Sequence, residues 1–169
     1  MAIPIWFLDI DGAVNVAGLR LPDHLSRTEA TTEGVTWPIH YSPEVVSVVN
    51  TVHRSGLAEI RWLTTWGQDA RTSFAPAVGL DEFPAYDMFD GERWWKFEIV
   101  TNSIASEGRP FVWTDDDLTE AGIADIRACT DVQSILIAPR TDDGLTAVEL
   151  SRITDFLALM QIIRGSCAL

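Results

Sequence analysis

The sequence contains few cysteines, few basic residues and no long hydrophobic segment, and each shortage excludes a class of protein. Its two cysteines, Cys129 and Cys167, lie too far apart to form a CxxC zinc or redox pair, and one possible disulfide is too few for a secreted scaffold. We therefore expect a reducing, cytoplasmic setting. No segment reaches the roughly 20 apolar residues that a membrane span requires, so no membrane partner is expected.

Basic residues are scarce relative to acidic ones. The chain has 12 Lys and Arg against 25 Asp and Glu, which gives a formal net charge of −13. This charge repels long nucleic acids, so non-specific binding to duplex DNA is not expected. The three histidines are dispersed and form no metal-binding motif. The remaining composition is ordinary, with 47% hydrophobic residues in a chain of 169, and it predicts one folded domain spanning 1–169.

Short apolar segments alternate with longer segments of helical periodicity. This alternation is typical of βα units around a parallel sheet. The predicted strands are 5–8, 59–63, 111–114 and 134–138, with a weaker candidate at 85–89. They are almost continuously apolar, as expected of strands that helices cover on both faces. The sequence therefore predicts an α/β fold.

Helix starts are marked most clearly at two places. Ser42 and Pro43 supply an N-cap and a first-turn proline before a stripe of valines. Thr146 and Glu149 form a capping box ahead of a second periodic segment. Further helices are expected at 68–78, 94–104 and 118–128.

Two other segments have a structural interpretation. Asp117, with Glu120 three residues later, is expected to be the N-cap of the helix at 118–128. Residues 13–41 lose the helical periodicity and are rich in Gly, Pro, Thr and charged residues. This region predicts a hairpin or a mobile flap rather than a separate folded unit.

The most informative segment is the first strand and the residues Asp9, Ile10, Asp11 and Gly12 that follow it. Two carboxylates, one residue apart, leave the carboxyl end of an apolar strand, which is the edge of an open α/β sheet where ligands bind. Carboxylates there are costly unless a cation or a proton compensates them, which indicates a metal site. Taken alone, the pattern also fits a solvated turn.

Later segments place further polar residues after predicted strands or on helices. The second strand ends in Thr64 and Thr65, whose hydroxyls suit an anion but also suit capping of the next helix. Lys96 is either an anion-binding lysine or an ordinary solvated lysine of a helix. Asp115 and Asp116 follow another apolar strand and have no local explanation.

The order of these residues resembles that of the haloacid dehalogenase-like (HAD) phosphohydrolase superfamily. Its four signatures match Asp9-Ile10-Asp11-Gly12, Thr64, Lys96 and Asp115-Asp116. DxDG with the downstream acidic pair is the specific part, and the segments WLTTW and WTDDDL look most like small bacterial and phage-encoded members. The resemblance implies a Rossmann-like three-layer α/β/α sandwich with a five-stranded parallel sheet in the order 5-4-1-2-3.

The resemblance also implies catalytic and metal-binding roles. Asp9 would be the nucleophile that forms an aspartyl-phosphate, and Asp11 would act as general acid and then as general base. Mg²⁺ would be held by Asp9, by the backbone carbonyl of Asp11, and by Asp115 and Asp116 directly or through water. The implied activity is Mg²⁺-dependent hydrolysis of a phosphomonoester.

Phosphate binding is implied for Gly12, for Lys96 and for Thr64, with Thr65 as the alternative one residue away. HAD enzymes usually take specificity from cap domains inserted after the first or the third strand. Here the first position holds only residues 13–41 and the second has no room for a folded cap, which makes a minimal cap. An open site follows. It fits a substrate too large to be enclosed, such as a nucleic-acid end or a protein, or a nucleotide covered by the flap.

The seven tryptophans bear on the substrate. Trp37, Trp66, Trp94 and Trp95 lie beside the proposed site elements, where each either stacks on a base or packs in the core. Two alternatives to a nucleotide phosphatase stay open. One is a phosphatase of another small metabolite, and the other is a catalytically idle HAD-fold module that binds a metal or a partner.

Overall fold

A parallel sheet forms the centre of the molecule. The structure is a computed structural model that describes residues 2–18, 21–89 and 94–166, so Cys167 lies outside it. In the spatial order β4-β1-β5-β6, the strands are Glu59–Trp62, Ile5–Leu8, Phe111–Thr114 and Ser134–Ile137. All neighbouring strands pair in parallel. The relative order of these four strands is the one that the resemblance implied.

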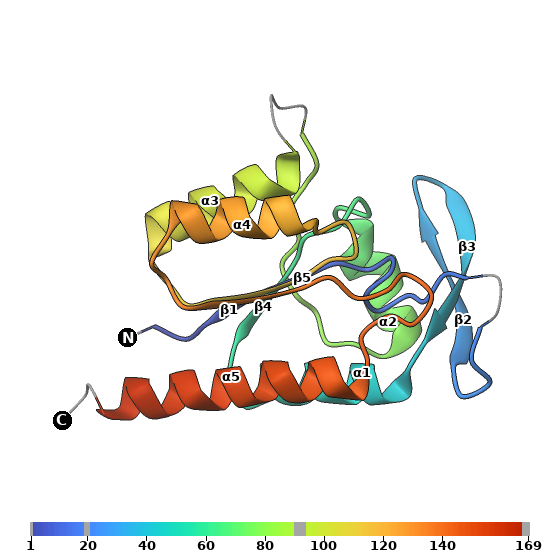
Figure 1. Ribbon diagram of the computed structural model, residues 1–169. Coiled ribbons are helices and arrows are strands. Elements are labelled where there is room, and N and C mark those ends of the chain that lie inside the picture. The colour runs from blue at the N-terminus through green and yellow to red at the C-terminus, as the bar shows by residue number, and fades with distance from the viewer. Residues whose placement is uncertain (1, 19–20, 90–93, 167–169) are drawn as a thin grey trace.

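Helices cover both faces of this sheet. They are α1 (Pro43–Arg54), α3 (Trp95–Glu107), α4 (Glu120–Cys129) and α5 (Ala147–Ser166). Figure 1 shows α3 and α4 on one face and α1 and α5 on the other. The predicted α/β class is confirmed. Among the described residues, no helix combines the length and the hydrophobicity that crossing a membrane requires.

One capping prediction is confirmed and one is wrong. Glu149 Oε2 accepts hydrogen bonds from the backbone N–H and the hydroxyl of Thr146, at 2.8 and 2.9 Å, as a capping box requires. Asp117 does not cap α4. The N-cap is Thr119, whose hydroxyl accepts the backbone N–H of Gly122 at 3.1 Å, while the backbone N–H of Asp117 donates to Asp115.

The predicted fifth strand is reduced to one bridge. Ala85 pairs in parallel with Trp62, where Trp62 donates to the Pro84 carbonyl and accepts from the Tyr86 N–H. Extending this ladder toward the N-terminus would require an N–H at Pro84, which proline lacks. Among the described residues, the sheet therefore has four strands and not the expected five.

The insertion after β1 is a β-hairpin. Strands β2 (Ser26–Thr32) and β3 (Val35–Tyr41) pair antiparallel across a two-residue turn in which Glu33 and Gly34 both have positive φ, 49° and 77°. Its backbone is tied to the π-helical segment η1 (Ala70–Phe74) and the residue before it, because Thr31 donates to Ser73 Oγ at 2.7 Å and Glu33 donates to Asp69 Oδ2 at 3.0 Å. With η1, the short helix α2 (Ala75–Val78) occupies the segment predicted as one helix at 68–78.

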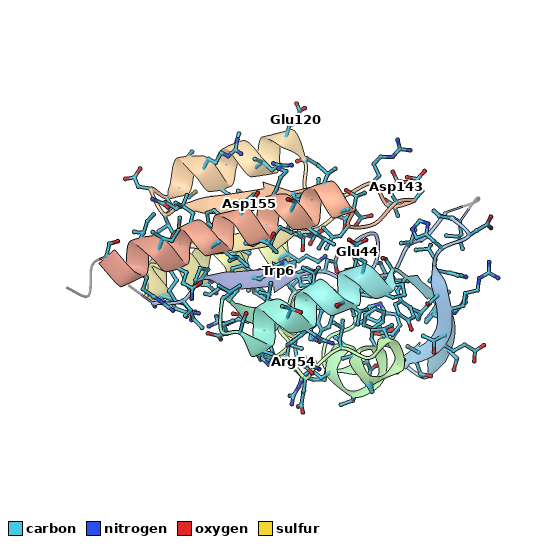
Figure 2. The ribbon with its side chains drawn as sticks, turned by 90° about the horizontal axis from the view of Figure 1, so that it is seen from below. Trp6, Glu44, Arg54, Glu120, Asp143 and Asp155 are labelled. Carbon is cyan, nitrogen blue, oxygen red and sulfur yellow. The ribbon has the colours of Figure 1, made fainter. Side chains whose placement is uncertain are left out.

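Apolar side chains pack on both faces of the sheet. Trp6, Trp62 and Trp113 are among the largest fully buried side chains, and Trp6 donates from Nε1 to Thr114 Oγ1 at 3.0 Å. Figure 2 shows Trp6 between α1 and α5, whereas the exposed Asp143 lies at the periphery. The central position of β1, buried at all four residues, fixes the point from which Asp9 leaves the sheet.

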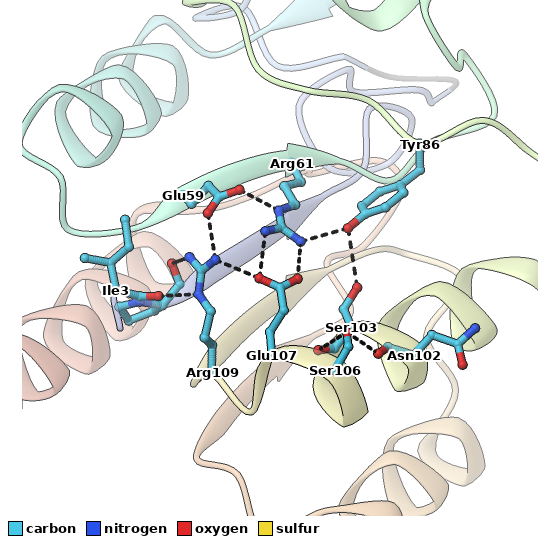
Figure 3. Close-up of polar contacts among 10 residues, drawn as sticks. Ile3, Glu59, Arg61, Tyr86, Asn102, Ser103, Ser106, Glu107 and Arg109 are labelled. Carbon is cyan, nitrogen blue, oxygen red and sulfur yellow. Dashed lines mark hydrogen bonds and ion pairs between the residues drawn. The ribbon is translucent and has the colours of Figure 1, made fainter. Parts of the chain in front are cut away.

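An ion-pair network joins β4 to the end of α3 (Figure 3). Glu107 accepts from both terminal nitrogens of Arg61, at 2.7 and 3.0 Å, and from Arg109 at 2.9 Å. Glu59 accepts from the same two arginines, each at 2.7 Å. Tyr86 accepts from Arg61 at 2.9 Å. The network connects one edge of the sheet to the helix that carries Lys96.

We expect Glu107→Gln to lower the free energy of unfolding by about 1 kcal/mol at neutral pH, because it removes one carboxylate from two arginines near the surface. Hydrogen bonds from Arg61, and then from Arg109, lower the pKa of Glu107. Its stabilising contribution is therefore present above the ordinary pKa and is lost as the pH falls through the folded-state pKa. Urea unfolding should show the difference from wild type shrinking on acidification, and the exposed Glu29→Gln is the control.

Candidate metal centre and active site

Two strands deliver the central carboxylates. Asp9 follows β1 and Asp115 follows β5, and these strands are parallel neighbours, so their carboxyl ends meet at one edge of the sheet. The Asp9 N–H donates to the Thr114 carbonyl at 3.1 Å, which continues the ladder into the site. One carboxylate oxygen from each of Asp9, Asp115 and Asp116 lies within 4.8 Å of the others. These three predicted residues are therefore brought together.

Lys96 lies between two of these carboxylates. From α3, its Nζ donates to Asp9 Oδ2 and to Asp115 Oδ2, both at 2.8 Å. Its side chain is only 2% exposed, so the interpretation as a solvated helix lysine is wrong. It is also the single lysine of the chain, a signal in the sequence that marks it for a specific role.

The third carboxylate is positioned by two loops. Thr141, in the loop after β6, donates its hydroxyl to Asp116 Oδ2 at 2.6 Å, a contact that sequence reasoning missed because Thr141 lies in an ordinary polar turn. Gly12 has a φ of +69°, and a Cβ there would lie 2.1 Å from Asp116 Cγ. Glycine is therefore required at this position by the space that Asp116 fills, whatever else it binds.

The Asp11 carboxylate is not part of the group of three carboxylates. Its Oδ1 accepts from Asn15 Nδ2 and its Oδ2 accepts from Trp66 Nε1, both at 2.8 Å. Asn15 Oδ1 in turn accepts the backbone N–H of His40, on β3, at 3.0 Å. The Asp11 carboxylate is thus fixed to the base of the hairpin. Asn15 carries no signal in the sequence that would predict this contact.

Thr64 and Thr65 differ in accessibility. Thr64 is fully buried, and its hydroxyl accepts the backbone N–H of Trp66 at 3.4 Å, within the turn that precedes η1. It does not cap the next helical segment, because the N-cap of η1 is Asp69. Thr65 is exposed beside Asp11 and lines a cavity with it. Both threonines leave the same edge of the sheet as Asp9, because β4 and β1 are parallel neighbours.

The acidic group is electrostatically unbalanced. When all three carboxylates are ionised, they and one ammonium leave two negative charges in a mostly buried site. Burial and the charge of Asp115 raise the pKa of Asp9 to about 8, although Lys96 opposes this. Burial also raises the pKa of Asp115. A group of three carboxylates, two of them with raised pKa values, suits a divalent cation, whose charge would balance theirs and whose preferred ligands are oxygens.

This imbalance predicts how stability depends on pH and on Mg²⁺. Since the folded-state pKa of Asp9 is about 8 and its ordinary value is 3.8, its contribution to stability is fully present below the ordinary value and is lost as the pH rises toward 8. In EDTA, the urea midpoint should fall between about pH 5 and about pH 8, and less so in Asp9→Asn. Added Mg²⁺ should stabilise the wild type more at the higher pH, where no proton competes. Equal stabilisation by Mg²⁺ at about pH 5 and at about pH 8 would contradict a metal site formed by these carboxylates.

A cavity of about 620 Å³ adjoins Asp11. It lies between the hairpin and the residues after β4. The described residues that line it are Asp11, Asn15, Ala17, Thr32, Glu33, Val35, Trp37, Pro38, Thr65, Trp66 and Met88. Of the four tryptophans considered for base stacking, Trp37 is half-exposed in this cavity. Trp66 and Trp95 are buried, and Trp94 stacks on Trp113 with ring centroids 5.3 Å apart.

Neither a family model, nor a curated protein, nor a solved structure matches this chain. What the site does is therefore inferred from its own geometry.

Proposed function

We propose that this protein is a Mg²⁺-dependent phosphomonoester hydrolase of the HAD type, acting on nucleotides or nucleic-acid ends through an aspartyl-phosphate on Asp9. The observation that carries the proposal is that the four acidic side chains occupy two different environments. Asp9, Asp115 and Asp116 gather around Lys96, whereas Asp11, two residues from Asp9, is held apart by Asn15 and Trp66. A site that only bound metal would not need this separate carboxylate.

Asp9, Asp115 and Asp116 would hold Mg²⁺, with the backbone carbonyl of Asp11 as the further ligand that the resemblance implies. The bound ion would neutralise the charge of the carboxylates and of the phosphoryl oxygens, which otherwise repel each other. Lys96 supplies one further positive charge at the Asp9 carboxylate. By opposing its protonation, Lys96 favours the ionised form of Asp9 that a nucleophile requires.

In the first step, a carboxylate oxygen of Asp9 attacks phosphorus, and the bond between phosphorus and the ester oxygen breaks. Asp11 gives its proton to that oxygen, so the alcohol leaves in neutral form. Hydrogen bonds from Asn15 and Trp66 fix the orientation of Asp11 for this transfer. The hydroxyl of Thr65 or Thr64 and the backbone beside Gly12 would hold the phosphoryl oxygens.

In the second step, water attacks the phosphorus of the aspartyl-phosphate and releases inorganic phosphate. Asp11, now ionised, takes a proton from that water, and the Asp9 carboxylate is restored. One acid thus serves both steps, because the proton that it gives in the first is recovered in the second. The hairpin supports this use, since its contact with Asn15 fixes Asp11 beside a cavity and outside the group of three carboxylates.

The test is release of phosphate from a generic aryl phosphate and from panels of nucleotides, phosphorylated oligonucleotides and sugar phosphates, with Mg²⁺ and with EDTA. We expect activity that requires Mg²⁺ and that falls at least about 1,000-fold in Asp9→Asn, which removes the nucleophile but keeps its shape. Asp117→Asn is the matched control, because Asp117 is an exposed acid two residues from Asp115 and lies outside the group of three carboxylates. No turnover on any panel would overturn the proposal.

A further inference from the structure

The cavity beside Asp11 lies where the leaving group of a phosphomonoester would lie. Asp11 lines it and is the acid that protonates the departing oxygen, so the remainder of the alcohol must extend from Asp11 into neighbouring space. The cavity offers that space, and its volume of about 620 Å³ is within the range that small-molecule sites occupy. The inference rests on the proposed function, because it uses the role of Asp11 as the general acid to place the leaving group.

Aromatic and apolar side chains line the hairpin side of this cavity. Val35 and Trp37, two residues apart on β3, share one face of the strand, and both are about half exposed. Trp66 and Met88 line the cavity from other segments. An exposed tryptophan beside other apolar side chains provides a flat surface on which a planar ring can stack.

The charges of the described lining residues disfavour binding of a second phosphate. Asp11 and Glu33 bring two carboxylates, and none of the described residues that line the cavity is basic. The whole chain, at −13, adds to this repulsion. A leaving group with its own phosphates would be disfavoured, whether it were a nucleotide diphosphate or the next nucleotides of a strand. Thr32 and Thr65 provide hydroxyls that suit an uncharged polar group such as ribose.

The cavity is already present in the protein alone, because core packing and hydrogen bonds hold the hairpin in place. Ala30 and Ile39, on its inner face, are buried in the same apolar core as Trp6, and Thr31 and Glu33 are hydrogen-bonded to the segment around η1. A preformed site avoids the entropic cost of ordering a flap around the ligand. Binding of the leaving group alone should therefore be measurable.

The geometry points to a nucleoside-binding site: the cavity takes the nucleoside of a nucleoside monophosphate, with the base stacked on Trp37 and the ribose toward Asp11 and Thr65. The favoured substrate is then a free mononucleotide, and a nucleic-acid end is disfavoured by the acidic residues of the described lining. Glu33 discriminates against a second phosphate.

The first experiment measures binding without catalysis. Titration calorimetry of the full chain with adenosine and with ribose should give a Kd for adenosine at least about 10-fold lower than that for ribose. Trp37→Ala should weaken adenosine binding about 10-fold or more, and Trp37→Phe should restore most of it. Leu159→Ala, on α5, is the control, because Leu159 has the same 51% exposure and lies outside the cavity. Equal Kd values for adenosine and ribose would overturn the inference, whether or not the protein hydrolyses phosphate esters.

The second experiment compares kcat/KM for adenosine 5′-monophosphate, ribose 5-phosphate, adenosine 5′-diphosphate and a 5′-phosphorylated oligonucleotide. We expect the monophosphate to exceed each of the others by about 10-fold or more, and Trp37→Ala to reduce its advantage over ribose 5-phosphate. Glu33→Lys should raise the ratio of diphosphate to monophosphate turnover, whereas Glu29→Lys makes the same charge change on the same hairpin, outside the cavity, and should not. A faster rate on the oligonucleotide would overturn the inference in favour of a nucleic-acid end. Equal rates on the monophosphate and ribose 5-phosphate would overturn it while leaving the phosphatase proposal intact.

Discussion

Lys96→Met is expected to lower the free energy of unfolding by about 3–5 kcal/mol at neutral pH in EDTA, because it leaves buried carboxylates without their counter-ion. Lys96 donates to both Asp9 and Asp115, and all three side chains are buried. Methionine fills a similar volume but carries no charge. The variant should therefore respond more strongly to Mg²⁺ than the wild type does, since the ion would be the main positive charge left in the site.

Urea unfolding with and without Mg²⁺ measures this effect. Arg140→Met is the control, because it removes the same charge from an exposed ion pair with Asp142 and should cost less than about 1 kcal/mol. If Lys96→Met does not fold at neutral pH, unfolding at about pH 5 keeps the comparison possible, since protonation of the carboxylates relieves their repulsion. A loss no larger than that of Arg140→Met would show that Lys96 is not the counter-ion of the cluster.

Much of the site could be predicted from the sequence because parallel strands fix where their carboxyl ends lie. Asp9 and Asp115 each follow an apolar strand. Their carboxylates therefore meet if these two strands are parallel neighbours in the sheet, as β1 and β5 are. The role of Lys96 was harder to predict, because it depends on which face of α3 packs against the sheet. The periodicity of that helix did not indicate this, although the uniqueness of the lysine could have.

The remaining contacts depend on loop conformations that local patterns do not determine. Asn15 reaches Asp11 only because the chain turns back after Gly12, and Thr141 reaches Asp116 across 25 positions of sequence. The cap of α4 is Thr119 and not Asp117, because both residue types can cap a helix and the local pattern does not determine which of them precedes the first turn. The fifth strand is limited to one bridge because Pro84 lacks the N–H that a longer ladder would require, although the apolar residues around it favour a strand.

Asp11→Asn is expected to slow hydrolysis of an alkyl phosphomonoester by about 100- to 10,000-fold, because the alcohol would have to leave as an unprotonated alkoxide. The effect should depend on the leaving group. A nitrophenolate leaves without a proton, so its release in the first step should be slowed much less. The second step still needs a base, and the variant should therefore release about one equivalent of nitrophenol rapidly and then turn over slowly.

Rapid-mixing kinetics with a nitrophenyl phosphate and with an alkyl phosphate measure this difference. Trp66→Phe tests the positioning of the acid separately, because it keeps the carboxylate but removes the hydrogen bond to Asp11 Oδ2. It should give a smaller loss with the same dependence on the leaving group, and a purely structural role would slow both substrates alike. Stabilisation by Mg²⁺ should persist in Asp11→Asn, since the Asp11 carboxylate lies outside the group of three. If Asp11→Asn slows hydrolysis of both phosphates equally and gives no burst of nitrophenol, Asp11 is not the general acid. The different environments of the Asp9 and Asp11 carboxylates would then need another explanation.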